Sequence, residues 1–327
     1  MTRALIAILL LLSTCAVVPA ATPSKPIFIF HTDEFWLNLH HFLYVLGRAQ
    51  NKTSDGSREA VIDAPADQDE GLATLSASER NVWNEAVSAY ASGNSKKDLV
   101  FDEPLTQLTK ALAQAGDARS LDGIDPATAA ILQRAAPIYR KAWWPKHQKA
   151  NRAWVTAMQP YVDKDGPTVL SFITRAYRFT WPEAGYAVHL SAFSNWAGAY
   201  STGVGVLVIS SLNEGNRGPY GLETLFHESM HQWDSQVFDA LRTQARANNK
   251  LVPRGLSHAL IFFTAGEAVR RVIPGHVPYA EKFGVWQRGM TQFKSPIEQT
   301  WKPHLDGKGT RDEAFAELVK LIGESKP

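Results

Sequence analysis

Cysteine is almost absent from this chain, which contains one, Cys15, among its 327 residues. That cysteine lies in an N-terminal segment with the features of a secretory signal. Arg3 provides a short positive region, residues 4–12 form an apolar core too short to cross a bilayer, and Val18-Pro19-Ala20 is a small-residue cleavage site. Cleavage after Ala20 leaves no cysteine, which excludes disulfides and thiolate metal sites from the mature chain. Any metal must then be held by histidine and carboxylate side chains.

These features predict an exported protein, periplasmic or secreted, with residues 1–20 as its signal peptide. The sequence Leu12-Ser13-Thr14-Cys15 is a poor match to a bacterial lipobox, because threonine precedes the cysteine. Lipid anchoring at Cys15 is therefore the minor alternative.

The chain also lacks an excess of charge of one sign and any later apolar run of transmembrane length. Its formal net charge is +2, which argues against nucleic acid as a main partner. The absence of a long apolar run predicts no stable membrane span after the signal. We find no internal repeat and no low-complexity tract, so the chain is expected to fold as a globular protein of one or two lobes.

The most specific pattern that is present is His227-Glu228-Ser229-Met230-His231. On an α-helix, residues four positions apart lie on one face, so both imidazoles can reach a single Zn²⁺. Glu228 is rotated about 100° round the helix and is placed to act on a water beside the metal, as a base. The alternative is a buried helix whose two histidines are satisfied by ordinary hydrogen bonds.

The residues that flank this motif have helical spacing. Apolar side chains recur on one stripe, and Pro219 precedes them at a position that helices tolerate. His227, His231 and Asp234 fall on a neighbouring stripe. The apolar stripe consists of Leu222, Phe226, Met230, Trp233, Val237 and Leu241.

A catalytic zinc site usually has a third protein ligand, and Glu267 is the candidate that we predict. It lies in the apolar segment 260–269, where an acidic side chain is rare unless it is paired or bound to a metal. Ala265, Gly266 and Ala268 are small, so this segment can approach the motif helix closely. The metzincin pattern is excluded, because the chain has Asp234 and Val237 where that class has glycine and histidine.

The two segments 227–231 and 264–268 together resemble the gluzincin metallopeptidases, the thermolysin-like group with two histidine ligands and one glutamate. The resemblance implies one zinc per chain, held by His227, His231 and Glu267, with Glu228 as general base. It does not extend over the rest of the chain. Arg271 stands where many gluzincins have an aspartate, and the exopeptidase motif Gly-x-Met-Glu-Asn is absent.

Two further roles need side chains that the motifs do not name. Stabilising the negative oxygen that forms during amide hydrolysis needs a donor, and His258, His276 and Tyr279 are the candidates, with Tyr279 favoured. A carboxylate is expected to orient one ligand histidine, and Asp234 or Asp239 can supply it.

The remaining pattern predicts an α+β fold, mainly α. Helices are expected at about 33–46, 76–92, 102–115, 126–159, 166–179, 279–303 and 311–322, with bends at Pro137 and Pro145 in the fourth. Strands are expected at 25–30, 186–191 and 204–210, forming a small antiparallel sheet with 194–202 at its edge. We divide the chain into a helical N-terminal region, 21–180, and a zincin-like catalytic region, 181–327.

The function that these observations predict is an exported zinc metallopeptidase acting on peptides or proteins. One alternative is a zinc hydrolase of another amide or ester, for example in the cell wall, since the same metal chemistry serves both. The other is a non-enzymatic exported binding protein with a structural or accidental motif. A structural site usually has four protein ligands and no adjacent base, so Glu228 argues against it.

Overall fold

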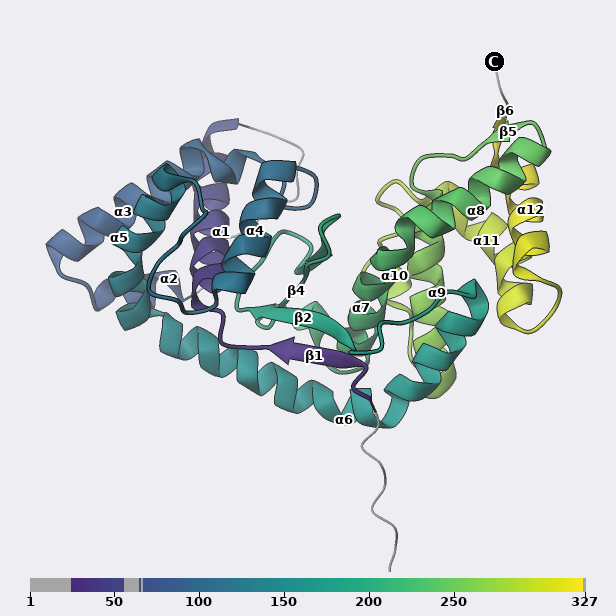
Figure 1. The fold of residues 1–327 in the computed structure, drawn as a ribbon, viewed down its shortest axis with the longest axis horizontal. Helices are drawn as coiled ribbons and strands as arrows, with labels where there is room; N and C mark the ends of the chain where they lie inside the picture. Colours follow the sequence, from purple (N-terminus) through teal and green to yellow (C-terminus); the bar gives the residue numbers. More distant parts are fainter. Residues whose placement is uncertain (1–24, 56–64, 66, 326–327) are drawn as a thin grey trace, which may run out of the picture.

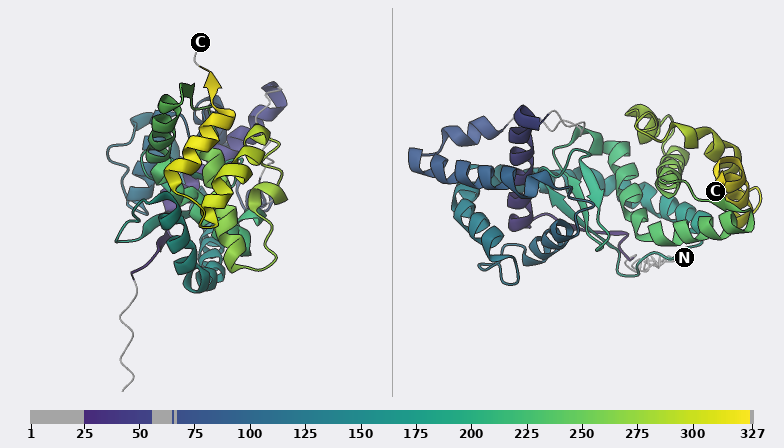
Figure 2. Two further views of the ribbon diagram at one scale, coloured as in Figure 1. Left: turned by 90° about the vertical axis from the view of Figure 1, so that its right-hand side faces the viewer. Right: turned by 90° about the horizontal axis from the view of Figure 1, so that it is seen from above.

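The computed structural model describes residues 25–55, 65 and 67–325, and shows two lobes joined by one long helix and a small sheet (Figure 1). The predicted signal peptide and Cys15 lie outside the described residues. The view from above shows the same division, with the strands between the lobes (Figure 2). The mainly helical α+β fold expected from the sequence is confirmed.

The N-terminal lobe is built from helices whose starts carry clear sequence signals. Ser76 and Glu79 form a reciprocal capping box, and Asp102 and Asp125 accept hydrogen bonds from the first turns of their helices. Two predicted helices are confirmed within a residue. The elements are α1 (Phe35–Asp55), α2 (Gln68–Ala73), α3 (Ala77–Ser92), η1 (Asn94–Lys96), α4 (Glu103–Ala115) and α5 (Pro126–Ala142).

The helix expected at 126–159 is two helices, and the second is longer than predicted. α5 ends at Ala142 and α6 (Trp144–Tyr177) begins directly after Trp143. Pro145 cannot donate to the carbonyl one turn before it, so the two helices separate there instead of bending. α6 then continues through Pro160 and Pro167 and absorbs the helix predicted at 166–179.

The sheet is mixed, which corrects the antiparallel sheet that we expected. Its strand order is β1-β2-β4-β3, from β1 (Phe28–His31), β2 (Tyr186–Ser191), β3 (Ala199–Ser201) and β4 (Leu207–Ser210). β1, β2 and β4 are parallel, and β3 pairs antiparallel with β4. β1 reaches β2 through the whole helical N-terminal lobe, and such a long crossover permits parallel pairing. β3 lies at an edge of this sheet, within the segment 194–202 predicted for that position.

The C-terminal lobe carries the motif segments. Its elements are η2 (Glu214–Asn216), α7 (Gly218–Met230), η3 (His231–Trp233), α8 (Asp234–Ala247), α9 (Leu256–Val272), α10 (Tyr279–Lys282), α11 (Thr291–Leu305) and α12 (Arg311–Ile322). β5 (Lys250–Leu251) and β6 (Glu324–Ser325) form a second, two-stranded sheet. The helix expected at 279–303 is interrupted, and only α10 and α11 are helical there.

Two apolar cores divide the molecule at a different point from the one predicted. One core is formed mainly by α1, α3, α4 and α5, and the other by the C-terminal part of α6, the sheet and α7 to α12. Trp144 belongs to the first core and Trp154 to the second, so the change falls within α6 and not at residue 180. α6 therefore contributes side chains to the cores of both lobes.

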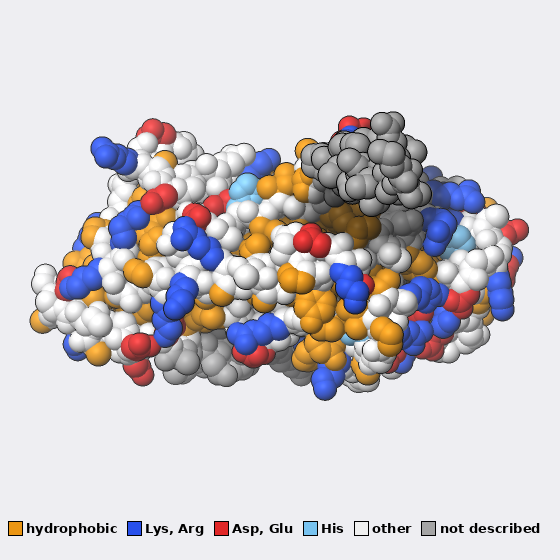
Figure 3. Space-filling view, turned by 90° about the horizontal axis from the view of Figure 1, so that it is seen from below, with side chains coloured by type: hydrophobic (Ala, Val, Ile, Leu, Met, Phe, Trp, Pro, Cys, Tyr) orange, Lys and Arg blue, Asp and Glu red, His pale blue; other side chains and the backbone are white. Residues whose placement is uncertain are grey.

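The surface shows no dominant sign of charge on the face seen from below, where Lys and Arg are interspersed with Asp and Glu (Figure 3). Among the described residues, none of the helices combines the length and the apolar character that crossing a bilayer requires.

Candidate metal centre

α7 and the turn after it carry the two histidines of the motif. The apolar stripe predicted beside them is buried throughout, which fixes the orientation of the helix. α7 ends at Met230, but His231 keeps right-handed helical backbone angles of −59° and −20°. The two imidazoles therefore stay on one side, with ring centroids 5.0 Å apart.

α9 brings a third histidine to this pair. His258 lies near the start of α9, which packs against α7, and its ring centroid is 5.3 Å from that of His227 and 5.1 Å from that of His231. One nitrogen from each of the three rings lies within 4.8 Å of the other two. Phe262, one turn further along α9, packs on the His227 ring at 3.7 Å between centroids. The three side chains thus converge on one point.

The chemistry of this group suits a cation. His227 Nδ1 is buried and has no hydrogen-bond partner among the described residues, which is costly for a polar atom. Burial lowers the pKa of His227 well below its usual value, and the neighbouring His231 and His258 lower it further. Burial and His231 likewise lower the pKa of His258 to about 4. Neutral imidazoles are the form that binds metal ions, so these histidines could hold a metal ion.

Asp234 orients His231, as one of the two carboxylates predicted for this role. His231 Nδ1 donates to Asp234 Oδ2 at 2.8 Å, which leaves Nε2 free to face the other histidines. Burial acts to lower the pKa of His231, but the hydrogen bond to Asp234 and the charges of Glu228 and Asp234 leave it raised. Asp239 is instead paired with Arg242 on the surface of α8.

Glu228 lies beside the histidines and does not belong to the converging group. Its Oε1 is 3.9 Å from His227 Nε2, and only 7% of the residue is exposed. Burial raises the pKa of this carboxyl, although the nearby His231 lowers it. Its backbone carbonyl accepts a hydrogen bond from the Ser201 hydroxyl at 2.7 Å, which ties α7 to the edge strand β3.

Glu267, predicted as the third ligand, is elsewhere. Its carboxylate is paired with Arg270 at 2.5 Å and with Arg271 at 2.8 Å, and it is absent from the group of converging ligand atoms. Residues 258 and 267 are nine apart, which is two and a half helical turns, so they lie on opposite sides of α9. Only one of them can face α7, and it is His258.

Tyr279, the favoured donor, is hydrogen-bonded to a buried carboxylate of α7. Its backbone N–H donates to both oxygens of Glu223 at 2.9 Å, and Glu223 lies one turn before His227 on α7. Burial raises the pKa of the Tyr279 hydroxyl, and the charges of Glu223 and Glu228 add to this against Arg288. His276 is bound to Glu223 at 2.6 Å and is buried, so it is not a free donor.

Tyr186 is a residue near the site that the sequence did not indicate. Burial raises the pKa of its hydroxyl, and the charges of Glu228 and Asp234 raise it further, so the phenol feels the charge of the site. It opens β2, and its position in an ordinary strand pattern carries no sign of a functional role. His258 was expected as a donor to the negative oxygen, and its place among the converging ligand atoms was missed because its spacing from the motif is not a known ligand pattern.

Comparisons of this chain with family models, with curated proteins and with solved structures gave no match.

Proposed function

We propose that this protein is an exported zinc-dependent metallopeptidase whose metal is held by His227, His231 and His258. The observation that carries the proposal is the convergence of three histidine nitrogens within 4.8 Å, with Glu228 beside them and outside the ligand set. A structural zinc site usually has four protein ligands, whereas three ligands and an adjacent carboxylate are typical of a hydrolytic site. When bound, zinc supplies a Lewis acid and makes a water acidic enough to react near neutral pH.

Glu228 is the general base in this proposal. It accepts a proton from the attacking water and passes it to the departing amine nitrogen. Among the described residues its carboxylate forms no ion pair with lysine or arginine, so it is available for proton transfer. Asp234 keeps His231 in the tautomer whose Nε2 can bind a metal. The charge of Glu228 raises the pKa of the Tyr279 and Tyr186 hydroxyls, so these are the candidate hydroxyl donors in the same region.

The edge strand favours a peptide over another amide or ester as the substrate. β3 pairs with β4 on one side and, among the described residues, with no strand on the other. An extended peptide can add to such an edge through backbone hydrogen bonds, which hold many sequences in one conformation. Because Ser201 of β3 is bonded to the Glu228 carbonyl, a chain lying along β3 passes the catalytic side chains.

The test is digestion of a mixed peptide library by the purified, zinc-loaded protein, with products identified by mass spectrometry. We expect cleavage that stops on chelation and is absent from the Glu228→Gln variant. Asp239→Asn is the matched control, because Asp239 is an acidic residue of the same region that is paired on the surface. Cleavage that persists in Glu228→Gln would refute the proposal. Hydrolysis of a cell-wall amide but of no peptide would favour the alternative hydrolase.

A further inference from the structure

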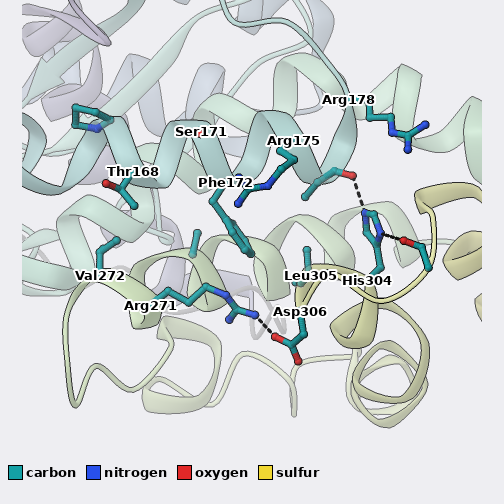
Figure 4. A pocket seen from close by; sticks show the side chains of 15 residues that line it. Thr168, Ser171, Phe172, Arg175, Arg178, Arg271, Val272, His304, Leu305 and Asp306 are labelled. Carbon is teal, nitrogen blue, oxygen red and sulfur yellow. Dashed lines mark hydrogen bonds and ion pairs between the residues drawn. The ribbon is translucent and has the colours of Figure 1, made fainter.

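A hollow lies at the C-terminal end of α9, whereas His258 lies near the start of this helix. It has a volume of about 950 Å³ and is bordered by the C-terminal part of α6, the C-terminal part of α9 and the loop after α11 (Figure 4). Ala268 and Val272 line it from α9, ten and fourteen residues after His258. The hollow is therefore separate from the candidate metal centre.

The floor of this hollow is apolar. Phe172 reaches from α6 toward α9, and Leu305 closes the end of α11 beneath it (Figure 4). The Arg271 guanidinium lies over the Phe172 ring, 4.8 Å from the ring centroid, and forms a cation–π contact there. Arg271 also pairs with Glu267 and with Asp306, the one acidic residue among the lining side chains.

The rim carries two further arginines that the fold does not use. Arg175 and Arg178 are exposed and belong to the lining, and neither guanidinium has a hydrogen bond or ion pair with another described residue. The Arg175 side chain points toward Phe172, whereas the Arg178 side chain points away from it (Figure 4). The guanidinium groups are not needed to complete the end of α6, which the backbone N–H of Arg178 closes by donating to the Thr174 carbonyl at 2.8 Å. The carbonyl of Ala176 accepts from His304 at 3.0 Å, and that of Tyr177 accepts from Arg311 at 2.8 Å.

The charge of the lining is therefore positive. The lining includes three arginines and one aspartate, and that aspartate is shared between Arg271 and Lys302. Guanidinium groups bind carboxylates through two parallel hydrogen bonds, and an apolar floor favours a ligand with a hydrocarbon part. We infer that this hollow is a binding site for a small amphipathic carboxylate, with its acid group at Arg175 and its apolar part on Phe172 and Val272, while Arg178 adds positive charge at the rim.

The experiment is calorimetric titration of the full-length protein with octanoate at low ionic strength, with 1-octanol and inorganic phosphate as comparison ligands. We expect octanoate to bind more tightly than either. The double variant Arg175→Ala/Arg178→Ala should weaken octanoate binding tenfold or more. The matched control is Arg119→Ala/Arg246→Ala, two exposed arginines outside the hollow, and it should bind octanoate as the wild type does.

A second variant tests the hollow without removing charge. Thr168 is exposed and lines the cavity from α6, so Thr168→Trp should fill it and abolish octanoate binding while both arginines remain. Circular dichroism and thermal unfolding establish that each variant is folded. Octanoate binding that both variants leave unchanged, or phosphate binding as tight as that of octanoate, would overturn the inference. Its outcome is independent of peptidase activity.

Discussion

Replacing His258 and Glu267 in turn separates the metal centre that the structure assembles from the one that the sequence predicted. His258→Ala removes one of three converging ligands, whereas Glu267→Gln changes a side chain on the opposite side of α9. Structural zinc sites with four ligands bind with about 10–16 kcal/mol, or roughly 3 kcal/mol for each ligand. His258→Ala should therefore weaken zinc binding by about two orders of magnitude.

Glu267→Gln should leave zinc affinity unchanged and lower the stability of the fold instead. Its carboxylate is 4% exposed and pairs with arginines that are 42% and 28% exposed, so solvent screens part of each pair. We expect a loss of about 1–3 kcal/mol in the free energy of unfolding, because the amide is neutral and replaces one accepting oxygen with an NH2 group that cannot accept from an arginine donor.

The assay is competition for zinc against a fluorescent chelator of known affinity, with urea unfolding of the same preparations of the zinc-free protein. Asp234→Asn provides an intermediate case, since loss of a carboxylate that orients a ligand histidine typically costs 10- to 100-fold in metal affinity. If Glu267→Gln lost zinc and His258→Ala retained it, the three-histidine centre would be wrong and the glutamate ligand correct.

Three other changes test separate parts of the structure. Glu228→Gln should keep zinc bound while turnover of a cleaved peptide falls by roughly a hundredfold or more, and loss of zinc in this variant would make Glu228 a ligand. Gly266→Ala places a Cβ 2.6 Å from the Cβ of Pro278, so urea unfolding should show a loss of about 1–3 kcal/mol, and an unchanged midpoint would contradict this contact. Burial lowers the pKa of His40 to about 3, so the folded chain keeps this imidazole neutral while the unfolded chain takes up a proton below about pH 6.5. The contribution of His40 is complete above pH 6.5 and falls toward pH 3, by about 2 kcal/mol between pH 8 and pH 5, and His40→Asn should flatten that part of the stability profile.

The local elements could be predicted from the sequence because their signals are local. The apolar stripe from Leu222 to Leu241 oriented the motif helix, and Ser76 and Asp102 marked helix starts that the structure has within a residue. The i, i+4 spacing of His227 and His231 was enough to place both imidazoles on one side.

Which third side chain joins His227 and His231 depends on tertiary structure. Glu267 is a buried acid in an apolar segment, and the sequence interpretation assigned it to the metal. Arg270 and Arg271 stand three and four residues after it, a spacing that satisfies a carboxylate within its own helix and that was the available signal against a ligand role.

Which face of α9 meets α7 is decided by packing over long sequence separations, and no period within the segment specifies it. The same holds for the sheet, where β1 pairs parallel with β2 across the whole N-terminal lobe. Helical and strand periods determine which side chains share a face of one element. The rotation of one element against another depends on the complete set of buried contacts, and that rotation put His258 beside His227 and His231.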